Sequence, residues 1–128
     1  MAKDAFDRGI ERAQQAGLSW EAQDLYATLA YWSWWYGLPE PEIISGLRSS
    51  RRQAELRRCY DRDPRTARSR CGTIARPARQ STHTTGDGFD LADDGWLDTR
   101  GAWTQYLGYT WGGAFRSPDP NHFDVRRT

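Results

Sequence analysis

The sequence predicts an α+β fold in which helices flank a small antiparallel sheet. Helical and strand-like patterns are mixed along the 128 residues, but no β-α-β repeat of the kind that builds a parallel sheet is present. Hydrophobic residues make up 38% of the chain and aromatic residues 13%, a composition that argues against intrinsic disorder. A chain of this length usually forms one domain with a modest core. We therefore expect residues 1–128 to form a single domain.

Two helices are predicted in the first forty residues. Residues 4–16 form the first helix, which Gly17 ends. Ser19 is suited to cap the second helix, and Gly37 stops it before two prolines. The apolar residues of the second helix that share one face are Leu25, Leu29, Trp32 and Tyr36. We expect this face to be buried.

The aromatic run YWSWWY occupies residues 31–36 and has two interpretations. Exposed aromatic side chains would suit a surface that binds carbohydrate or a membrane. Buried aromatic side chains would give a small domain the bulk its core needs. The sequence favours the core interpretation.

The rest of the chain predicts further short elements. GFDLA alternates Phe89 and Leu91 with Asp90, the pattern of a half-buried strand. HFDVR places Phe123 and Val125 on one face of a terminal strand. The predicted elements are a short buried strand over 42–45, a helix over 49–63, a long surface loop within 62–80, strands over 88–92 and 122–126, and a helix over 98–107.

Charge and targeting signals exclude several classes of protein. The net charge is +1, so no global field attracts nucleic acid, and the arginines within 48–79 are expected to form a solvated face. No apolar run approaches the ~20 residues of a membrane span. The first thirty residues carry charges throughout and do not form a signal peptide. We expect synthesis in the cytoplasm and no membrane insertion.

Cys59 and Cys71 are expected to be free thiols, although one disulfide remains possible.

Three residues remain as candidate metal ligands after the common motifs are excluded. The sequence has no H-E-x-x-H and no C-x-x-C, and the aspartates after Gly88 lack the spacing of an EF-hand. The remaining candidates are His83, Asp90 and His122. Glycines between His83 and Asp90 break the extended path and allow the two side chains to converge. The residues alone leave open whether these are ligands or ordinary surface or core side chains.

Four ordered segments resemble a family of zinc peptidases. STHTTGDGFD (81–90) fits S-x-H-x-x-G-x-[AG]-x-D, and DPNH (119–122) fits [DE]-x-x-H followed by an aromatic residue. LGYTWGG lies between them, and IISGLRSSRRQAEL lies upstream. In this order the segments resemble the zinc D-alanyl-D-alanine carboxypeptidases, the D-alanyl-D-alanine dipeptidases and the phage L-alanyl-D-glutamate endopeptidases. The resemblance covers about residues 43–125, the motif-bearing core, and leaves the helical residues 1–40 without a comparable signal.

The resemblance implies a Hedgehog/DD-peptidase-like fold and a role for six residues. It implies that His83, Asp90 and His122 bind zinc. It implies that Asp119 is the catalytic base, and that Arg48 and Ser81 bind the substrate, with Arg48 also stabilising the developing oxyanion. Three positions depart from the usual pattern. Leu47 replaces an aromatic residue, Gly88 replaces alanine in what we expect to be a tolerable change, and Asp119 replaces the glutamate of the dipeptidases.

The function implied is hydrolysis of the peptide stems of bacterial peptidoglycan by a monomeric, Zn²⁺-dependent enzyme. An aspartate at 119 resembles the phage endolysins, which favours an L-alanyl-D-glutamate endopeptidase that acts on the cell wall after release from the cytoplasm. A D-alanyl-D-alanine carboxypeptidase or dipeptidase is the alternative within the family. A non-catalytic cell-wall binding module with the same fold, or a metal-free structural protein, is the alternative of another class.

Overall fold

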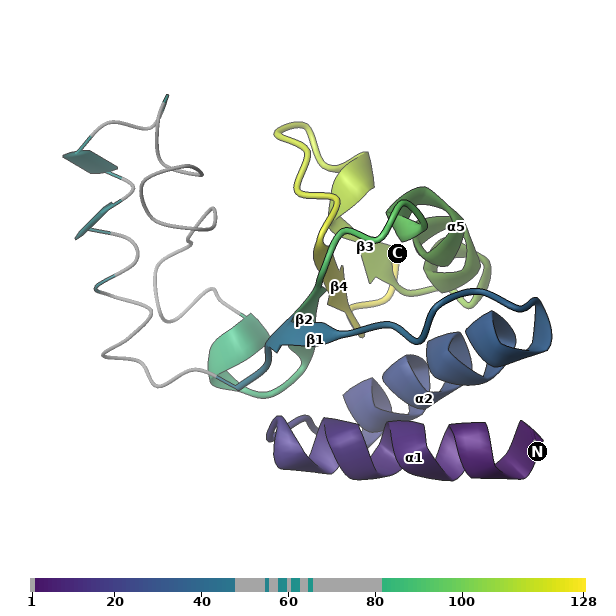
Figure 1. Cartoon of the computed structure of the whole chain (residues 1–128). Helices are drawn as coiled ribbons and strands as arrows, with labels where there is room; N and C mark the ends of the chain where they lie inside the picture. The colour runs from purple at the N-terminus through teal and green to yellow at the C-terminus, as the bar shows by residue number, and fades with distance from the viewer. Residues whose placement is uncertain (1, 48–54, 56–57, 60, 63–64, 66–81) are drawn as a thin grey trace.

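In the part of the chain that it describes, the computed structural model combines three bounded α-helices with a four-stranded antiparallel sheet, which confirms the α+β class (Figure 1). The structure describes residues 2–47, 55, 58–59, 61–62, 65 and 82–128. Its elements are α1 (Ala2–Gln15), α2 (Trp20–Trp35), β1 (Ile43–Ser45), the 3₁₀-helix η2 (Thr82–Thr84), β2 (Gly88–Leu91), α5 (Leu97–Tyr106), β3 (Thr110–Trp111), the 3₁₀-helix η3 (Gly112–Ala114) and β4 (His122–Asp124). The predicted helix over 49–63 and loop within 62–80 lie largely outside the described residues.

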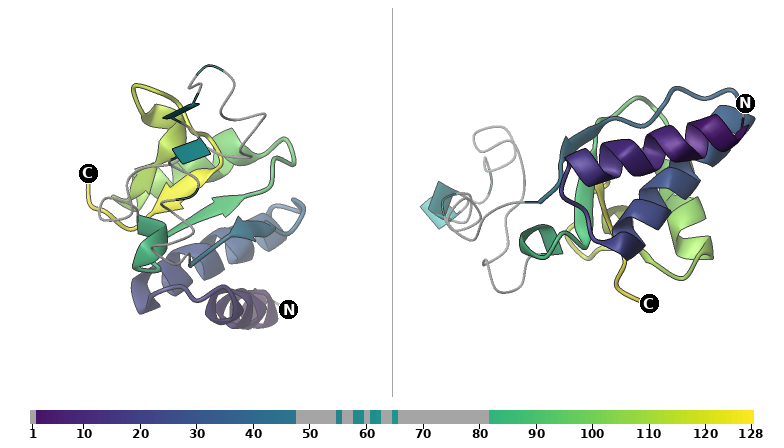
Figure 2. Two further views of the ribbon diagram at one scale, coloured as in Figure 1. Left: turned by 90° about the vertical axis from the view of Figure 1, so that its left-hand side faces the viewer. Right: turned by 90° about the horizontal axis from the view of Figure 1, so that it is seen from below.

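The first two helices form an antiparallel pair below the sheet (Figures 1 and 2). Gly17 adopts φ 75° and ends the turn after α1, and the Ser19 hydroxyl caps α2 by accepting a hydrogen bond from the Ala22 N–H. Gly9 lets the helices approach closely, because a Cβ there would lie 2.9 Å from the Ala27 Cα. The two predicted helices are thus confirmed, with α1 over Ala2–Gln15 in place of the predicted 4–16.

The sheet has the order β1-β2-β4-β3, with β2 and β4 at its centre. In this central pair Phe89 lies opposite Phe123, and Asp90 lies opposite His122. The two phenylalanine rings stack, and Tyr26 of α2 meets Phe89 edge to face. Since side chains alternate along a strand, the phenylalanines face the helices and Asp90 and His122 face the other way. All of β2 is buried, so the prediction of a half-buried strand was wrong.

The core lies between α2 and the sheet. Its buried members are Ala13, Leu18, Ala22, Leu25, Tyr26, Leu29, Phe89, Leu91, Leu97, Phe123 and Val125. Strand β1 is at the edge of the sheet, and Ile44 is 57% exposed, which corrects the prediction of a buried strand there. The helix predicted over 98–107 and the terminal strand are confirmed as α5 and β4, while β3 was not predicted.

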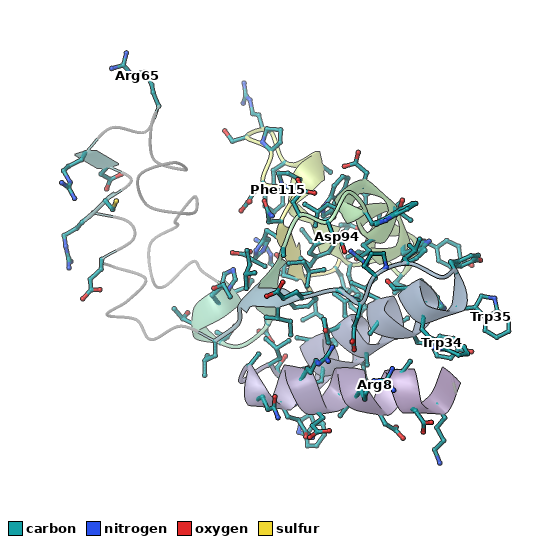
Figure 3. The ribbon with its side chains drawn as sticks, in the orientation of Figure 1. Arg8, Trp34, Trp35, Arg65, Asp94 and Phe115 are labelled. Carbon is teal, nitrogen blue, oxygen red and sulfur yellow. The ribbon has the colours of Figure 1, made fainter. Side chains whose placement is uncertain are left out.

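The aromatic run at the end of α2 is largely at the surface, contrary to the core interpretation. Trp34, Trp35 and Tyr36 are 43%, 63% and 66% exposed, and Figure 3 shows Trp34 and Trp35 pointing away from the molecule. Consecutive helical residues point in different directions, so a six-residue aromatic run cannot all face one core. A groove of about 320 Å³ is lined by Tyr31, Trp32, Trp35, Tyr36, Trp103 and Tyr106.

A fully buried arginine joins α5 to α2 and to the segment that follows it. The guanidinium of Arg100 donates two hydrogen bonds of 2.7 Å to the Asp94 carboxylate. It also donates to the Ser33 hydroxyl and to the Pro39 carbonyl oxygen. A buried cation requires such complete pairing.

We expect Arg100→Ala to lower the free energy of unfolding by roughly 3 kcal/mol, because it removes a buried side chain and leaves the buried Ser33 hydroxyl and the partly buried Asp94 carboxylate without its hydrogen bonds. Urea titration followed by circular dichroism would measure the loss. Arg127→Ala is the control, because the Arg127 side chain is 65% exposed and such surface changes usually have small effects. Equal stability of the two variants would contradict the structural role of Arg100.

The structure also bears on the expectations about membrane insertion and about the two cysteines. Among the described residues, no helix combines the length and the apolar character that crossing a membrane requires. Cys59 is disulfide-bonded, so the expectation of free thiols was wrong for this residue. Its partner lies outside the described part of the chain.

Candidate metal centre

Three polar side chains from separate segments meet on the sheet face that points away from α2. Asp90 and His122 are partners in the register of β2 and β4, and His83 comes from η2. Gly86, with φ 79°, turns the chain between η2 and β2. His83, Asp90 and His122 are 4%, 4% and 7% exposed. The structure thus brings together the three ligands that the sequence predicted.

The atoms that face one another form a nearly equilateral triangle. His83 Nε2 lies 3.3 Å from His122 Nδ1 and 3.3 Å from Asp90 Oδ1, and His122 Nδ1 lies 3.2 Å from the same Asp90 oxygen. Tetrahedral Zn²⁺ binds nitrogen and oxygen ligands at about 2.0–2.2 Å, which places two such ligand atoms about 3.3–3.6 Å apart. The three side chains therefore fit one metal ion of this size.

The outer nitrogen of each histidine makes an ordinary hydrogen bond. His122 Nε2 lies 2.7 Å from Asp124 Oδ2, and His83 Nδ1 lies 2.9 Å from the Gly46 carbonyl oxygen. Charge-assisted hydrogen bonds to nitrogen are about 2.7–2.9 Å long, whereas the three inner distances are longer. The inner contacts are thus long for hydrogen bonds and also have the spacing of metal ligands, and the hydrogen-bonded outer nitrogens are typical of histidines at metal sites.

The α1–α2 turn supports the segments that carry His83. The Leu47 N–H donates to the Ala16 carbonyl oxygen, and the Ser19 N–H donates to the Gly86 carbonyl oxygen. A Cβ on Gly46 would overlap the backbone of Ala16, so only glycine permits this approach. The turn therefore fixes Gly46, whose carbonyl oxygen orients the His83 ring.

Gly88 lies in β2 and leaves room for the side chains of the site because it has no Cβ. A Cβ at this position would overlap the Thr82 hydroxyl and would lie 3.0 Å from the His122 Cε1. Alanine, the usual residue of the resembling motif, is therefore not accommodated unless Thr82 moves.

The cluster holds two ionised carboxylates in a buried place. Burial opposes ionisation of Asp90, but hydrogen bonds with His122 and His83 outweigh it and hold the pKa of this carboxyl well below its usual range. Burial likewise opposes ionisation of Asp124, yet hydrogen bonds with His122 and Arg126 lower its pKa to about 2. Burial alone would lower the pKa of His122, but hydrogen bonds with Asp124 and Asp90 raise it to about 9. At neutral pH the two ionised carboxylates therefore favour a cation beside them, here the protonated His122.

The structure fixes the backbone of Asp119 next to His122. The Asp119 N–H donates to the Gly112 carbonyl oxygen at 2.8 Å, and the Asp119 carbonyl oxygen accepts from the His122 N–H at 3.0 Å. The residue is half-buried. The other two predicted site residues, Arg48 and Ser81, lie outside the described residues.

Sequence reasoning missed two groups around the candidate metal ligands. Asp124 follows His122 by two residues, so strand alternation could have placed both on one face. The Gly46 carbonyl oxygen carries no such signal, because a backbone acceptor is visible only once the fold is known. Both groups bond the outer nitrogens of the histidines.

Comparison with known proteins adds no family assignment. No protein-family model matches the chain, and no curated protein matches it.

Proposed function

We propose that the protein is a zinc-dependent peptidase with a Hedgehog/DD-peptidase-like fold that hydrolyses the peptide stems of bacterial peptidoglycan. The observation that carries the proposal is the buried triangle of His83 Nε2, Asp90 Oδ1 and His122 Nδ1. The chain has only two histidines, and both occupy motif positions of the zinc peptidases that it resembles. Among these enzymes, the aspartate at position 119 favours the L-alanyl-D-glutamate endopeptidases.

The donor set favours zinc over the hard divalent cations. Two imidazole nitrogens and one carboxylate oxygen suit Zn²⁺, and three protein ligands are typical of its catalytic sites. Calcium and magnesium prefer sites built from oxygen. A bound zinc ion would supply Lewis acidity and would lower the pKa of a water molecule.

The remaining steps need groups from the chain that move protons and hold the substrate. Asp119 is the proposed general base, because its carboxylate can accept a proton and later return it to the leaving amine. Its backbone is held to Gly112 and His122, which limits the distance between base and ligands. Arg48 and Ser81 are the proposed substrate contacts, by resemblance alone. A non-catalytic binding module would not require a base at 119.

We expect the purified protein to contain about one zinc per chain, because three protein ligands with an open position suit this ion. Elemental analysis after purification without chelators measures the content. His122→Ala serves as the control and should contain almost none. Less than about a tenth of an equivalent in the natural chain, with none gained when zinc is added, would contradict the metal centre.

We expect digestion of Gram-negative peptidoglycan to release new alanine carboxyl termini and new glutamate amino termini. These ends mark hydrolysis between L-alanine and D-glutamate, and mass spectrometry of the digest identifies them. Free D-alanine or the D-alanyl-D-alanine dipeptide would instead indicate the alternative specificity and leave the zinc site in place. An intact stem after prolonged incubation of the zinc-loaded protein would contradict peptidase activity.

A further inference from the structure

Asp124 is a buried carboxylate to which the proposed reaction assigns no step. Its side chain is fully buried, and it lies two residues after His122 in β4. Alternation along the strand places both side chains on the same face. Asp124 Oδ2 is 2.7 Å from His122 Nε2, a length typical of a charge-assisted hydrogen bond.

The Asp124 carboxylate is itself held on its far side by Arg126. Its Oδ1 accepts hydrogen bonds from the Arg126 backbone N–H and from Nε, at 3.0 and 3.1 Å. Its Oδ2 accepts from an Arg126 terminal nitrogen at 2.8 Å. This paired contact fixes both oxygens, since rotation of the carboxylate would break several bonds at once.

The His122 ring is enclosed on its other sides as well. Gly88 lies opposite Asp124 in the register, and its missing side chain leaves the ring its space. Phe115 lies 6.0 Å from the ring, centroid to centroid, and the Arg126 guanidinium lies 5.9 Å from the centroid of Phe115. Asp124 and Arg126 therefore belong to one packed group around the imidazole.

A neutral imidazole that donates its Nε2–H to a fixed carboxylate has its Nδ1 lone pair available. In His122 that atom is the corner of the triangle shared with His83 Nε2 and Asp90 Oδ1. We propose that Asp124, anchored by Arg126, is a positioning residue that selects the Nε2–H tautomer of His122 and aims its Nδ1 at the metal. The inference rests on the proposed metal centre and adds Asp124 to it. Such outer partners typically contribute 10–100-fold to metal affinity.

Asp124→Asn tests the inference through zinc affinity rather than through activity. The amide nearly preserves the shape of the carboxylate but is a weaker acceptor and presents N–H groups to Arg126 or to His122. Competition with a colorimetric zinc chelator should show ~10–100-fold weaker binding than in the natural chain. The matched control is Asp7→Asn, the same change at an exposed position of α1, which should leave the affinity unchanged. Arg126→Ala should weaken binding less than Asp124→Asn, because it leaves the bond to His122 in place.

Nitrogen-15 NMR of the histidine rings supplies a second measurement. Its result would not change if Asp124 only supported the fold. With only two histidines in the chain, the spectrum has two ring systems, which His83→Ala assigns. In the zinc-loaded natural protein, His122 should carry its proton on Nε2 and His83 on Nδ1. In Asp124→Asn the His122 pattern should change and the His83 pattern should persist.

The outcomes separate this inference from the proposed function. Failure of the natural chain to bind zinc would overturn both. Suppose that the natural chain binds zinc and that the zinc affinity of Asp124→Asn lies within about twofold of it, instead of showing the loss expected for an outer partner. That result would overturn the role of Asp124 alone. If Asp124→Asn does not fold, NMR of the natural protein still tests the inference, because a proton on Nδ1 of zinc-loaded His122 would contradict it.

Discussion

Asp119→Ala is expected to keep zinc bound while losing nearly all hydrolysis of peptidoglycan, whereas His83→Ala and His122→Ala are expected to lose both. The difference follows from the roles proposed for the residues. The histidines would hold the metal with their inner nitrogens, while the base would only move a proton. Loss of a general base typically lowers the rate ~10²–10⁴-fold. Turnover of soluble peptidoglycan stems and zinc content, measured on the same samples, give the comparison.

The control for these variants is Asp7→Ala, which removes a carboxylate from an exposed position of α1. It should keep both zinc and turnover. Removal of a general base should abolish most of the turnover. If Asp119→Ala retained more than about half of the turnover, Asp119 would not be the base. If His122→Ala kept its zinc, the triangle would not be the metal site.

Gly112→Ala is expected to lower activity by about 10²-fold, because a misplacement of about 1 Å at a catalytic centre can have an effect of this size. A Cβ on Gly112 would overlap the Asp119 carbonyl oxygen and lie 2.9 Å from the His122 Cβ. The first neighbour is backbone and cannot rotate away, so the turn between Asp119 and His122 must shift. The free energy of unfolding should also fall by about 1–3 kcal/mol.

Activity assays and urea titration of the same variant check both effects. Ala114→Ser, a small change at an exposed position of the same 3₁₀-helix, is the control and should behave as the natural chain does. Natural activity in a well-folded Gly112→Ala protein would show that the spacing of Asp119 and His122 does not govern the reaction.

The elements of the fold were predictable where local signals define them. Ser19 and Gly17 carry standard capping signals, and the alternation around Phe89 and Phe123 has the period of a strand. The direction in which an element faces was less predictable. A strand at the centre of the sheet is covered on both sides, so β2 is buried throughout despite its alternating pattern. The tryptophans at the end of α2 are exposed, because the face buried by this helix is set by its partners.

The candidate site was predictable to the extent that side chains define it. The motifs named His83, Asp90 and His122, and the glycines between the first two indicated that they could converge. Spacing could not give the register that pairs Asp90 with His122, nor which nitrogen of each ring faces inward. Backbone acceptors such as the Gly46 carbonyl oxygen are set by tertiary packing, which no local pattern records.

The support that the α1–α2 turn gives to His83 bears on how this chain could be re-engineered. The sequence motifs lie within 43–125, which suggests a portable catalytic unit that could be grafted onto another scaffold. Yet Ala16 and Ser19 hydrogen-bond the segments on either side of His83, through Leu47 and Gly86. A chimera that exchanges the helical pair should therefore retain the turn over 16–19. Without this turn, His83 would lose the backbone hydrogen bonds that hold the segments on either side of it.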